Sequence, residues 1–186
     1  MLTRRRKFIR EKVESILTEN RITKPQVPVE KIADRYGIDV RTEAVDGDVS
    51  GFLIRQVGKP GAIIGINSNQ SLKRRRFTLG HELAHFFLHN ERGSDMVHVD
   101  QSSRFFIKLR DADSSKGEDA DEMEANFFAA ELLMPAKFLE ADIARHGGFD
   151  LSEDDNTVSV LAERYGVSTQ AMSYRLAYLG WMGPEH

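Results

Sequence analysis

The chain has 186 residues, a formal net charge of −3, 40% apolar residues and no cysteine. This length suits one domain, or one domain with a small extra module, and the apolar fraction is enough for a hydrophobic core. The absence of cysteine excludes disulfides and thiolate metal sites, which leaves His, Asp and Glu as metal ligands. No apolar run is long enough to cross a bilayer, and the charged start lacks the apolar stretch of a secretory signal. We therefore expect a cytoplasmic protein that does not contact membranes.

The first part of the chain predicts a helix followed by a small sheet. Residues 3–20 have the apolar spacing of a basic amphipathic helix, and a second helix from Val29 to Tyr36 ends at a glycine. Three strand-like runs follow at residues 38–44, 50–57 and 62–67, separated by turn signals. We expect a small meandering sheet whose edge strand can bind an extended peptide by strand addition.

Residues 77–89, FTLGHELAHFFLH, contain the pattern H-E-x-x-H at His81, Glu82 and His85. We expect a helix that begins near Ser71, on which positions i and i+4 lie on one face. Two histidines so placed can bind one metal ion, and the adjacent glutamate can act as a general base. The pentapeptide alone is equally compatible with two core histidines that hydrogen-bond. A third ligand decides between these interpretations.

The next elements are a strand, a loop and a second long helix. The strand lies within residues 97–109, centred on 105–107, and residues 110–121 are acidic and predict a surface loop. The helix is expected to begin near Asp119, which forms a capping box with Glu122 three residues later.

Glu124 lies on this second helix among alanines and phenylalanines, and we expect it to be the third metal ligand. Together with His81 and His85 it makes a His2Glu set that leaves one position open, as in catalytic zinc sites. Glu82 is the expected general base and, later, the proton donor. The predicted reaction is hydrolysis of a peptide bond. Zn2+ is the expected ion, and the same ligands also accept Mn2+.

Three further polar residues compete for roles near this site. His89 follows His81 by eight positions and lies about 12 Å further along the helix, too far to join the same ion. We therefore favour a role for His89 in hydrogen-bonding a ligand or capping the helix. His98 and Arg110 are candidates for stabilising an oxyanion, and no spacing favours either.

The end of the chain predicts more helices. Pro135 opens a helix through about Arg145, and residues 158–180 resemble a helix-turn-helix. Charges across the latter segment are nearly balanced, whereas DNA-binding segments are usually basic, which argues against direct DNA binding. We expect three parts: an N-terminal basic helix at 1–25, a metallopeptidase domain at 26–147 and a helix-turn-helix-like tail at 148–186.

The segments FTLGHELAHFFLH and EMEANFFAAELLMP together resemble the ImmA/IrrE family of metallopeptidases. The likeness extends to DVSGFLI and INSNQSLKRRRF upstream and to the tail downstream, so it covers roughly residues 28–180. The resemblance implies an α+β, zincin-like fold, in which a small sheet packs on the H-E-x-x-H helix. It also implies His81, His85 and Glu124 as metal ligands and Glu82 as the catalytic acid and base.

Members of that family cleave helix-turn-helix (Xre-like) repressors, which relieves transcriptional repression in stress responses or during mobile-element induction. The resemblance therefore implies a protein substrate of this kind for a zinc-dependent endopeptidase. The alternative is a DNA-binding or sensing regulator whose metal site is structural and which has no protease activity. A third possibility is an inactive scaffold without metal.

Overall fold

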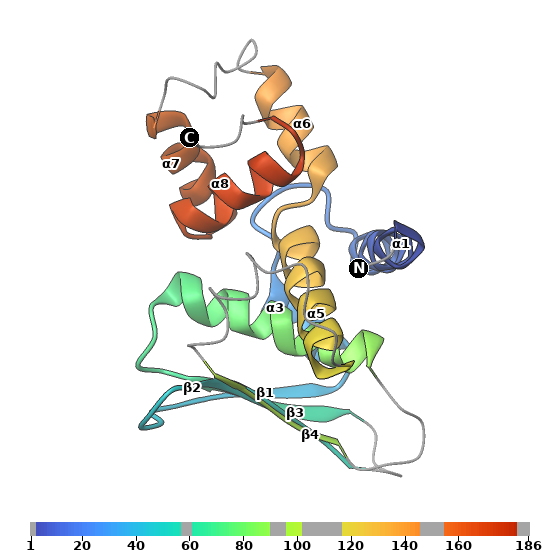
Figure 1. Ribbon diagram of the computed structural model, residues 1–186, viewed down its shortest axis with the longest axis vertical. Coiled ribbons are helices and arrows are strands. Elements are labelled where there is room, and N and C mark those ends of the chain that lie inside the picture. Colours follow the sequence, from blue (N-terminus) through green and yellow to red (C-terminus); the bar gives the residue numbers. More distant parts are fainter. Residues whose placement is uncertain (1–2, 57–60, 90–95, 102–116, 146–154, 182–186) are drawn as a thin grey trace.

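A computed structural model describes residues 3–56, 61–89, 96–101, 117–145 and 155–181. In Figure 1 a four-stranded sheet forms one layer, with helix α3 (Leu72–Leu88) lying on it and helix α5 (Gly117–Leu133) crossing above α3. The predicted α+β class, with a small sheet packed on the H-E-x-x-H helix, is confirmed. The remaining helices are α1 (Thr3–Glu19), α2 (Val29–Arg35), α6 (Ala136–Arg145), α7 (Asp155–Tyr165) and α8 (Thr169–Tyr178).

The sheet has the strand order β1-β3-β2-β4. Its strands are β1 (Ile38–Glu43), β2 (Val49–Arg55), β3 (Ala62–Asn67) and β4 (Met96–Gln101). Strand β2 runs antiparallel to β3 and β4, but β1 pairs with β3 in parallel, with Ile38 opposite Ala62. The predicted meander is therefore wrong at β1, which does not pair with the strand that follows it.

The connection between β1 and β2 passes the end of β3 and is held there by one side chain. The amide of Asn67 donates to the backbone oxygens of Val45 (2.9 Å) and Val49 (2.8 Å) and accepts from the Val45 N–H (3.3 Å). Asn67 is buried, so its amide needs these partners. These bonds position β3 between β1 and β2, which the turn signals in the sequence do not reveal.

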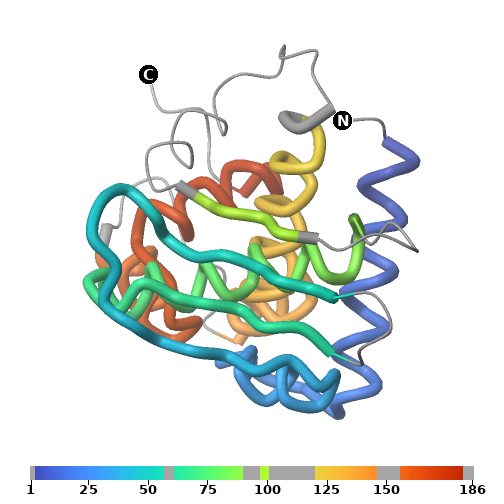
Figure 2. Tube along the Cα trace, turned by 90° about the horizontal axis from the view of Figure 1, so that it is seen from below, coloured from blue at the N-terminus to red at the C-terminus, as the bar shows by residue number. Residues whose placement is uncertain are grey.

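One face of the sheet rests directly on α3. Leu53 and Ile64 are fully buried at this contact, while Val97 and Val99 on β4 are exposed on the other face. Figure 2 looks onto the sheet with the helices behind it. The sheet and α3 approach closely at Gly51, where an added Cβ atom would lie 2.6 Å from Cγ2 of Thr78. Glycine is required at position 51 because any side chain would clash with Thr78. Its absence of a side chain lets the sheet lie close to α3, the helix that carries the histidines.

Helix α5 approaches α3 through small residues, as expected. A Cβ added to Gly80 would lie 3.4 Å from Cβ of Ala129, and Ala125 and Ala129 are fully buried. Helix α5 begins at Gly117, so Asp119 lies inside the helix and the predicted capping box is wrong. Residues 105–107 and Arg110 lie outside the described residues, so the predictions made for them are not addressed by the structure.

The last helices pack into the same hydrophobic core as the rest of the chain. Helices α7 and α8 are joined through Gly166, which has a φ of 65°, and Ser168 caps α8 by accepting from the backbone N–H of Ala171. Arg175 on α8 is 3% exposed and donates to both carboxylate oxygens of Glu131 on α5 (3.0 and 2.7 Å). The division into three domains stays a prediction. Among the helices described, none has the length and apolar character needed to cross a bilayer.

Candidate metal centre

Helix α3 carries His81, Glu82 and His85 on its buried side. The three side chains are at most 2% exposed, in a helix whose first turn is capped by Ser71. One helical turn separates the two histidines, and their Nε2 atoms lie 3.1 Å apart. Two ring nitrogens in such contact need either a proton or a cation between them.

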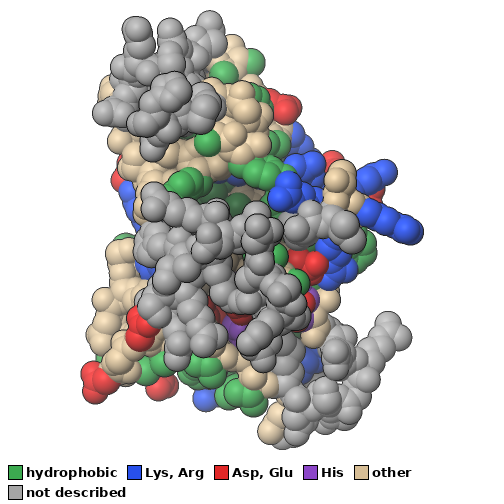
Figure 3. All heavy atoms as spheres, viewed as in Figure 1, with side chains coloured by type: hydrophobic (Ala, Val, Ile, Leu, Met, Phe, Trp, Pro, Cys, Tyr) green, Lys and Arg blue, Asp and Glu red, His purple; other side chains and the backbone are tan. Residues whose placement is uncertain are grey.

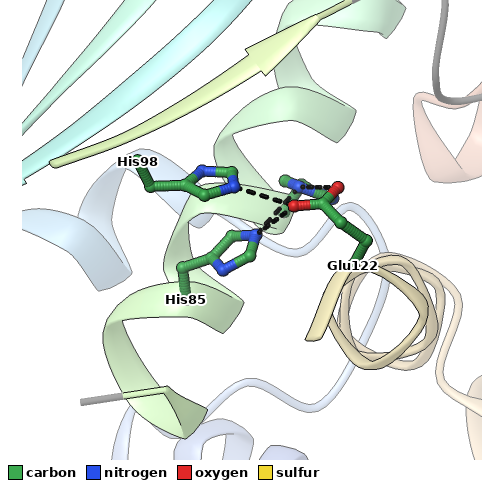
Figure 4. A group of neighbouring side chains, drawn as sticks. His85, His98 and Glu122 are labelled. Carbon is green, nitrogen blue, oxygen red and sulfur yellow. Dashed lines mark hydrogen bonds and ion pairs between the residues drawn. The ribbon is translucent and has the colours of Figure 1, made fainter. Parts of the chain in front are cut away.

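Glu122 of α5 reaches both histidines. Its carboxylate oxygens lie 3.5 Å from Nε2 of His81 and 3.4 Å from Nε2 of His85. Figure 4 shows Glu122 pointing from α5 toward His85 on α3 and His98 on β4. Among the described residues, these four side chains form one group that could hold a metal ion.

The structure does not bring Glu124 to the His81–His85 pair. Its carboxylate accepts from Arg5 at 2.8 and 2.7 Å and lies 3.1 Å from Nε2 of His89. The reason is helical geometry: two residues turn the helix by about 200°, so Glu122 and Glu124 point to different sides of α5. The expectation that Glu124 is the third ligand therefore lacks the required contact, and Glu122 has it.

The protonation of the site fits a divalent cation. Nδ1 of His81 lies 3.0 Å from the amide oxygen of Asn126, which can only accept, so the proton of His81 is on Nδ1 and Nε2 has a free lone pair. Burial lowers the pKa of His81 to about 3 and also lowers the pKa of His85, so both rings are neutral. Burial would raise the pKa of Glu122, but hydrogen bonds from His85 and His98 outweigh it and lower this pKa. Two imidazoles and a carboxylate are a donor set that Zn2+ and Mn2+ accept.

Glu82 has the properties of a general base. It is fully buried, and burial raises its pKa to about 7 despite the hydrogen bond from His98. Its Oε2 atom lies 3.2 Å from Nδ1 of His98, while Oε1 is buried with no hydrogen-bond partner among the described residues. An unpartnered buried oxygen is unfavourable. Glu82 can therefore accept a proton or a hydrogen bond from a ligand near neutral pH.

His98 lies between Glu82 and Glu122 and contacts both carboxylates. Its Nε2 atom lies 2.8 Å from Oε1 of Glu122, and its ring stacks on His85 with centroids 3.7 Å apart. Burial opposes protonation of His98, but its hydrogen bonds to Glu122 and Glu82 outweigh this and raise its pKa to about 10. Both ring nitrogens then donate, so His98 acts here as a cation between two carboxylates and not as a lone-pair donor.

Comparison with known proteins identifies the family. Residues 33–177 match the family model described as the IrrE N-terminal-like domain, peptidase M78. The chain belongs to the peptidase M78 family. This confirms the resemblance found in the sequence, and it makes the chain a member of a metal-dependent peptidase family. No curated protein matches the chain significantly.

A solved structure shares the fold of this M78 chain. The chain is similar to a Mycobacterium tuberculosis transcriptional regulator, with a TM-score of 0.59 and 16% sequence identity. The match covers 91% of this chain and 46% of that one, so the M78 chain spans less than half of that protein's length. At this identity the likeness shows a common fold alone.

Sequence reasoning missed two residues of the M78 site, Glu122 as a contact of both histidines and Asn126 as the partner of His81. One signal was present: Glu122 and Asn126 are four residues apart, the same spacing as His81 and His85, so each pair lies on one helix face. In Figure 3, histidine and acidic side chains are visible near the middle of one face. Of the cluster, His98 and Glu122 are partly exposed, with side-chain exposures of 20% and 13%.

Proposed function

We propose that this chain is a metal-dependent endopeptidase that acts in the cytoplasm and cleaves a helix-turn-helix (Xre-like) repressor, so relieving repression. The observation that carries the proposal is the group formed by His81, His85 and Glu122, next to the buried Oε1 of Glu82, to which no described residue donates a hydrogen bond. The donor atoms all belong to deprotonated groups, and the base lies beside them. This is the arrangement that metal-assisted hydrolysis requires.

We further propose that His81, His85 and Glu122 hold the ion, with Glu122 in the role expected for Glu124. Zn2+ is the first choice and Mn2+ the second, because imidazole and carboxylate suit both. When bound, such an ion supplies a Lewis acid that polarises the substrate carbonyl and favours the ionisation of water. Asn126 supports the site by keeping the proton of His81 on Nδ1, away from the ligand position.

The proton transfers of hydrolysis fall to Glu82. Its pKa near 7 lets the carboxylate accept a proton from the attacking water and return it to the leaving amine. His98 holds Oε2 of Glu82 at 3.2 Å, which leaves Oε1 as the oxygen that faces this exchange. The same imidazolium lies beside the site where negative charge develops on the substrate, which favours His98 for oxyanion stabilisation.

Strand β4 gives an extended peptide a place to bind. Within the described sheet β4 is an edge strand that pairs only with β2, and it carries His98 toward the site. Backbone groups of such an edge can pair with a substrate strand. The choice of a repressor as substrate follows from the family resemblance, and the printed name of the fold neighbour, a transcriptional regulator, is a reason to test repressors first.

The alternative, a DNA-binding or sensing regulator without protease activity, has less support. Across the described residues of α7 and α8 the basic side chains are Arg164 and Arg175. Arg164 donates to Asp142 at 2.6 and 3.0 Å, and Arg175 is buried on Glu131. Both cations are thus already paired, whereas DNA binding relies on cations directed at phosphates.

The test compares wild-type protein with Glu82→Gln, each with Zn2+ or Mn2+ and a candidate repressor, and detects fragments by mass spectrometry. We expect fragments from the wild type alone and equal metal content in both proteins. Glu122→Gln should lose the ion, while Glu124→Gln, a matched substitution two residues away, should retain it with weaker affinity. An intact repressor with every protein, together with a shifted DNA fragment in a gel, would favour the alternative.

A further inference from the structure

A chain of hydrogen bonds links His85 to the N-terminal helix. Nδ1 of His85 lies 3.1 Å from Nδ1 of His89, and Nε2 of His89 lies 3.1 Å from Oε2 of Glu124. Arg5 of α1 then donates to both oxygens of Glu124, from Nε at 2.8 Å and from Nη2 at 2.7 Å. Four side chains from three helices thus form one continuous series that begins at a proposed metal ligand.

Each member of this series restrains the orientation of the next. The Glu124 carboxylate, held by Arg5, fixes Nε2 of His89 and so directs Nδ1 of His89 at Nδ1 of His85. The contact at Nδ1 in turn fixes the ring of His85, with Nε2 on its other side. That nitrogen is the one that faces His81 and Glu122. The series therefore holds the His85 ring in the orientation that directs Nε2 at the proposed ion site.

We infer that Arg5 is a positioning residue for the metal centre, acting through Glu124 and His89 to hold the His85 ring in its metal-binding orientation. The inference rests on the proposed metal site and extends it to a helix that precedes the sheet. Arg5 suits this role because a guanidinium stays charged and binds a carboxylate with two parallel bonds, which fixes the orientation of Glu124. Burial alone would raise the pKa of Glu124, but Arg5 and His89 together lower it.

The same contacts argue against a second cation site at this position. His89, Asp121 and Glu124 lie close enough together to hold an ion. However, the guanidinium of Arg5 already occupies both oxygens of Glu124 and supplies the positive charge. Asp121 is no substitute for Glu124, because its oxygen is 3.6 Å from Nε2 of His89 and its side chain is 55% exposed.

Helix α1 has other anchors, so loss of the Arg5 guanidinium should not detach it. Ile9, Val13, Ile16 and Leu17 are at most 4% exposed in the core, and Arg10 donates to Glu131 at 3.0 Å. The side chain of Arg5 itself is 37% exposed. Arg5→Gln is thus a mild change to the fold, and Arg4→Gln removes the same charge from an exposed neighbour as a matched control.

The first measurement is the restraint on the His85 ring in the metal-free protein, read from histidine ring 15N NMR signals at a pH of about 8, above the ordinary histidine pKa. In wild type and Arg4→Gln we expect the same His85 shifts and line widths. In Arg5→Gln we expect shifted and broadened His85 signals, because the ring has lost its restraint. Identical His85 signals in Arg5→Gln and wild type would overturn the inference.

The second measurement is Zn2+ affinity, determined by competition with a chelating indicator. Loss of a hydrogen-bond partner behind a ligand weakens metal binding by about 10- to 100-fold. We expect about tenfold for Arg5→Gln, no change for Arg4→Gln, and partial recovery in Arg5→Lys, which keeps the charge. Glu124→Gln gives a second route if Arg5→Gln folds poorly, and it should show the same change in the His85 ring signals.

The two proposals fail differently. A wild-type protein that binds no Zn2+ contradicts the proposed function, while the comparison of His85 ring signals in metal-free protein still tests the role of Arg5. A wild-type protein that binds Zn2+ as tightly as both Arg5→Gln and Glu124→Gln leaves the function standing and overturns the inference.

Discussion

Substituting Gly51 by alanine tests how closely the sheet rests on helix α3. The new Cβ atom would lie 2.6 Å from Cγ2 of Thr78 and 2.9 Å from the backbone oxygen of Gly65. Carbon atoms in proteins pack best at about 3.5–4.0 Å, so strand β2 or helix α3 must move. The new atom would also lie 3.6 Å from Oε1 of Glu82, so the movement reaches the proposed general base.

The expected loss of stability follows from these contacts. Overpacking a core destabilises by about 1–3 kcal/mol. Replacing glycine in a strand restores about 0.5–1 kcal/mol, because alanine has fewer unfolded conformations to lose. The net expectation for Gly51→Ala is a loss of about 1–2 kcal/mol in the free energy of unfolding. For a chain of this size that lowers the midpoint of thermal unfolding by about 2–8 °C.

Urea unfolding of four variants provides the assay. Thr78→Ser removes the methyl group that Gly51→Ala would contact, so the double variant should be more stable than the sum of the single effects by about 1 kcal/mol. Gly80→Ala is the matched control, since its Cβ would lie at an acceptable 3.4 Å from Ala129 and alanine favours the helix. Wild-type stability in Gly51→Ala, or strict additivity with Thr78→Ser, would refute the reasoning.

Three further predictions concern ionised groups. In metal-free protein, 13C NMR should give Glu82 a pKa of about 7. Added Zn2+ should lower this pKa, because a nearby cation favours the ionised carboxylate. An unchanged pKa after addition of Zn2+ would argue against an ion at this site. Burial would raise the pKa of Asp142, but its hydrogen bonds, first that from Arg164, lower this pKa in the folded state. The ionised Asp142 therefore stabilises the fold at any pH above the unfolded-state pKa. This stabilisation is lost as the pH falls through the lower folded-state pKa. Asp142→Asn should therefore cost about 1–3 kcal/mol at neutral pH and flatten the acid limb of a stability–pH curve. Arg175→Met should destabilise by about 1–3 kcal/mol because it leaves the buried Glu131 carboxylate with Arg10 as its remaining partner, and adding Glu131→Leu should recover part of that loss in urea titrations.

The sequence predicted elements correctly where neighbouring residues alone determine the structure. Strand β3 was predicted at residues 62–67 and α3 was predicted to begin near Ser71, and both agree with the structure. Gly166 likewise ends α7 as expected, because a left-handed residue stops a helix. The prediction that two histidines lie on one face of α3 required only the helical repeat, which the H-E-x-x-H spacing contains.

The parts that could not be predicted depend on contacts between distant segments. The acidic start of α5 offers Asp121, Glu122 and Glu124, and which of them faces α3 depends on how α5 is rotated about its axis. That rotation is set by packing of Ala125 and Ala129 against α3, which no local pattern encodes. The position of β1 beside β3 similarly depends on the long-range bonds made by Asn67.

The anchoring of α8 to α5 has a practical consequence for anyone who edits this protein. The guanidinium of Arg175 holds Glu131 and also the backbone oxygen of Met134, at the end of the helix that carries Glu122. Deleting α7 and α8, or transferring them to another protein as a separate module, would remove the contact that anchors the C-terminal end of α5. Truncated variants should therefore be assayed for hydrolytic activity and metal content as well as for solubility. A shortened protein that still folds can have lost the arrangement of its proposed metal ligands.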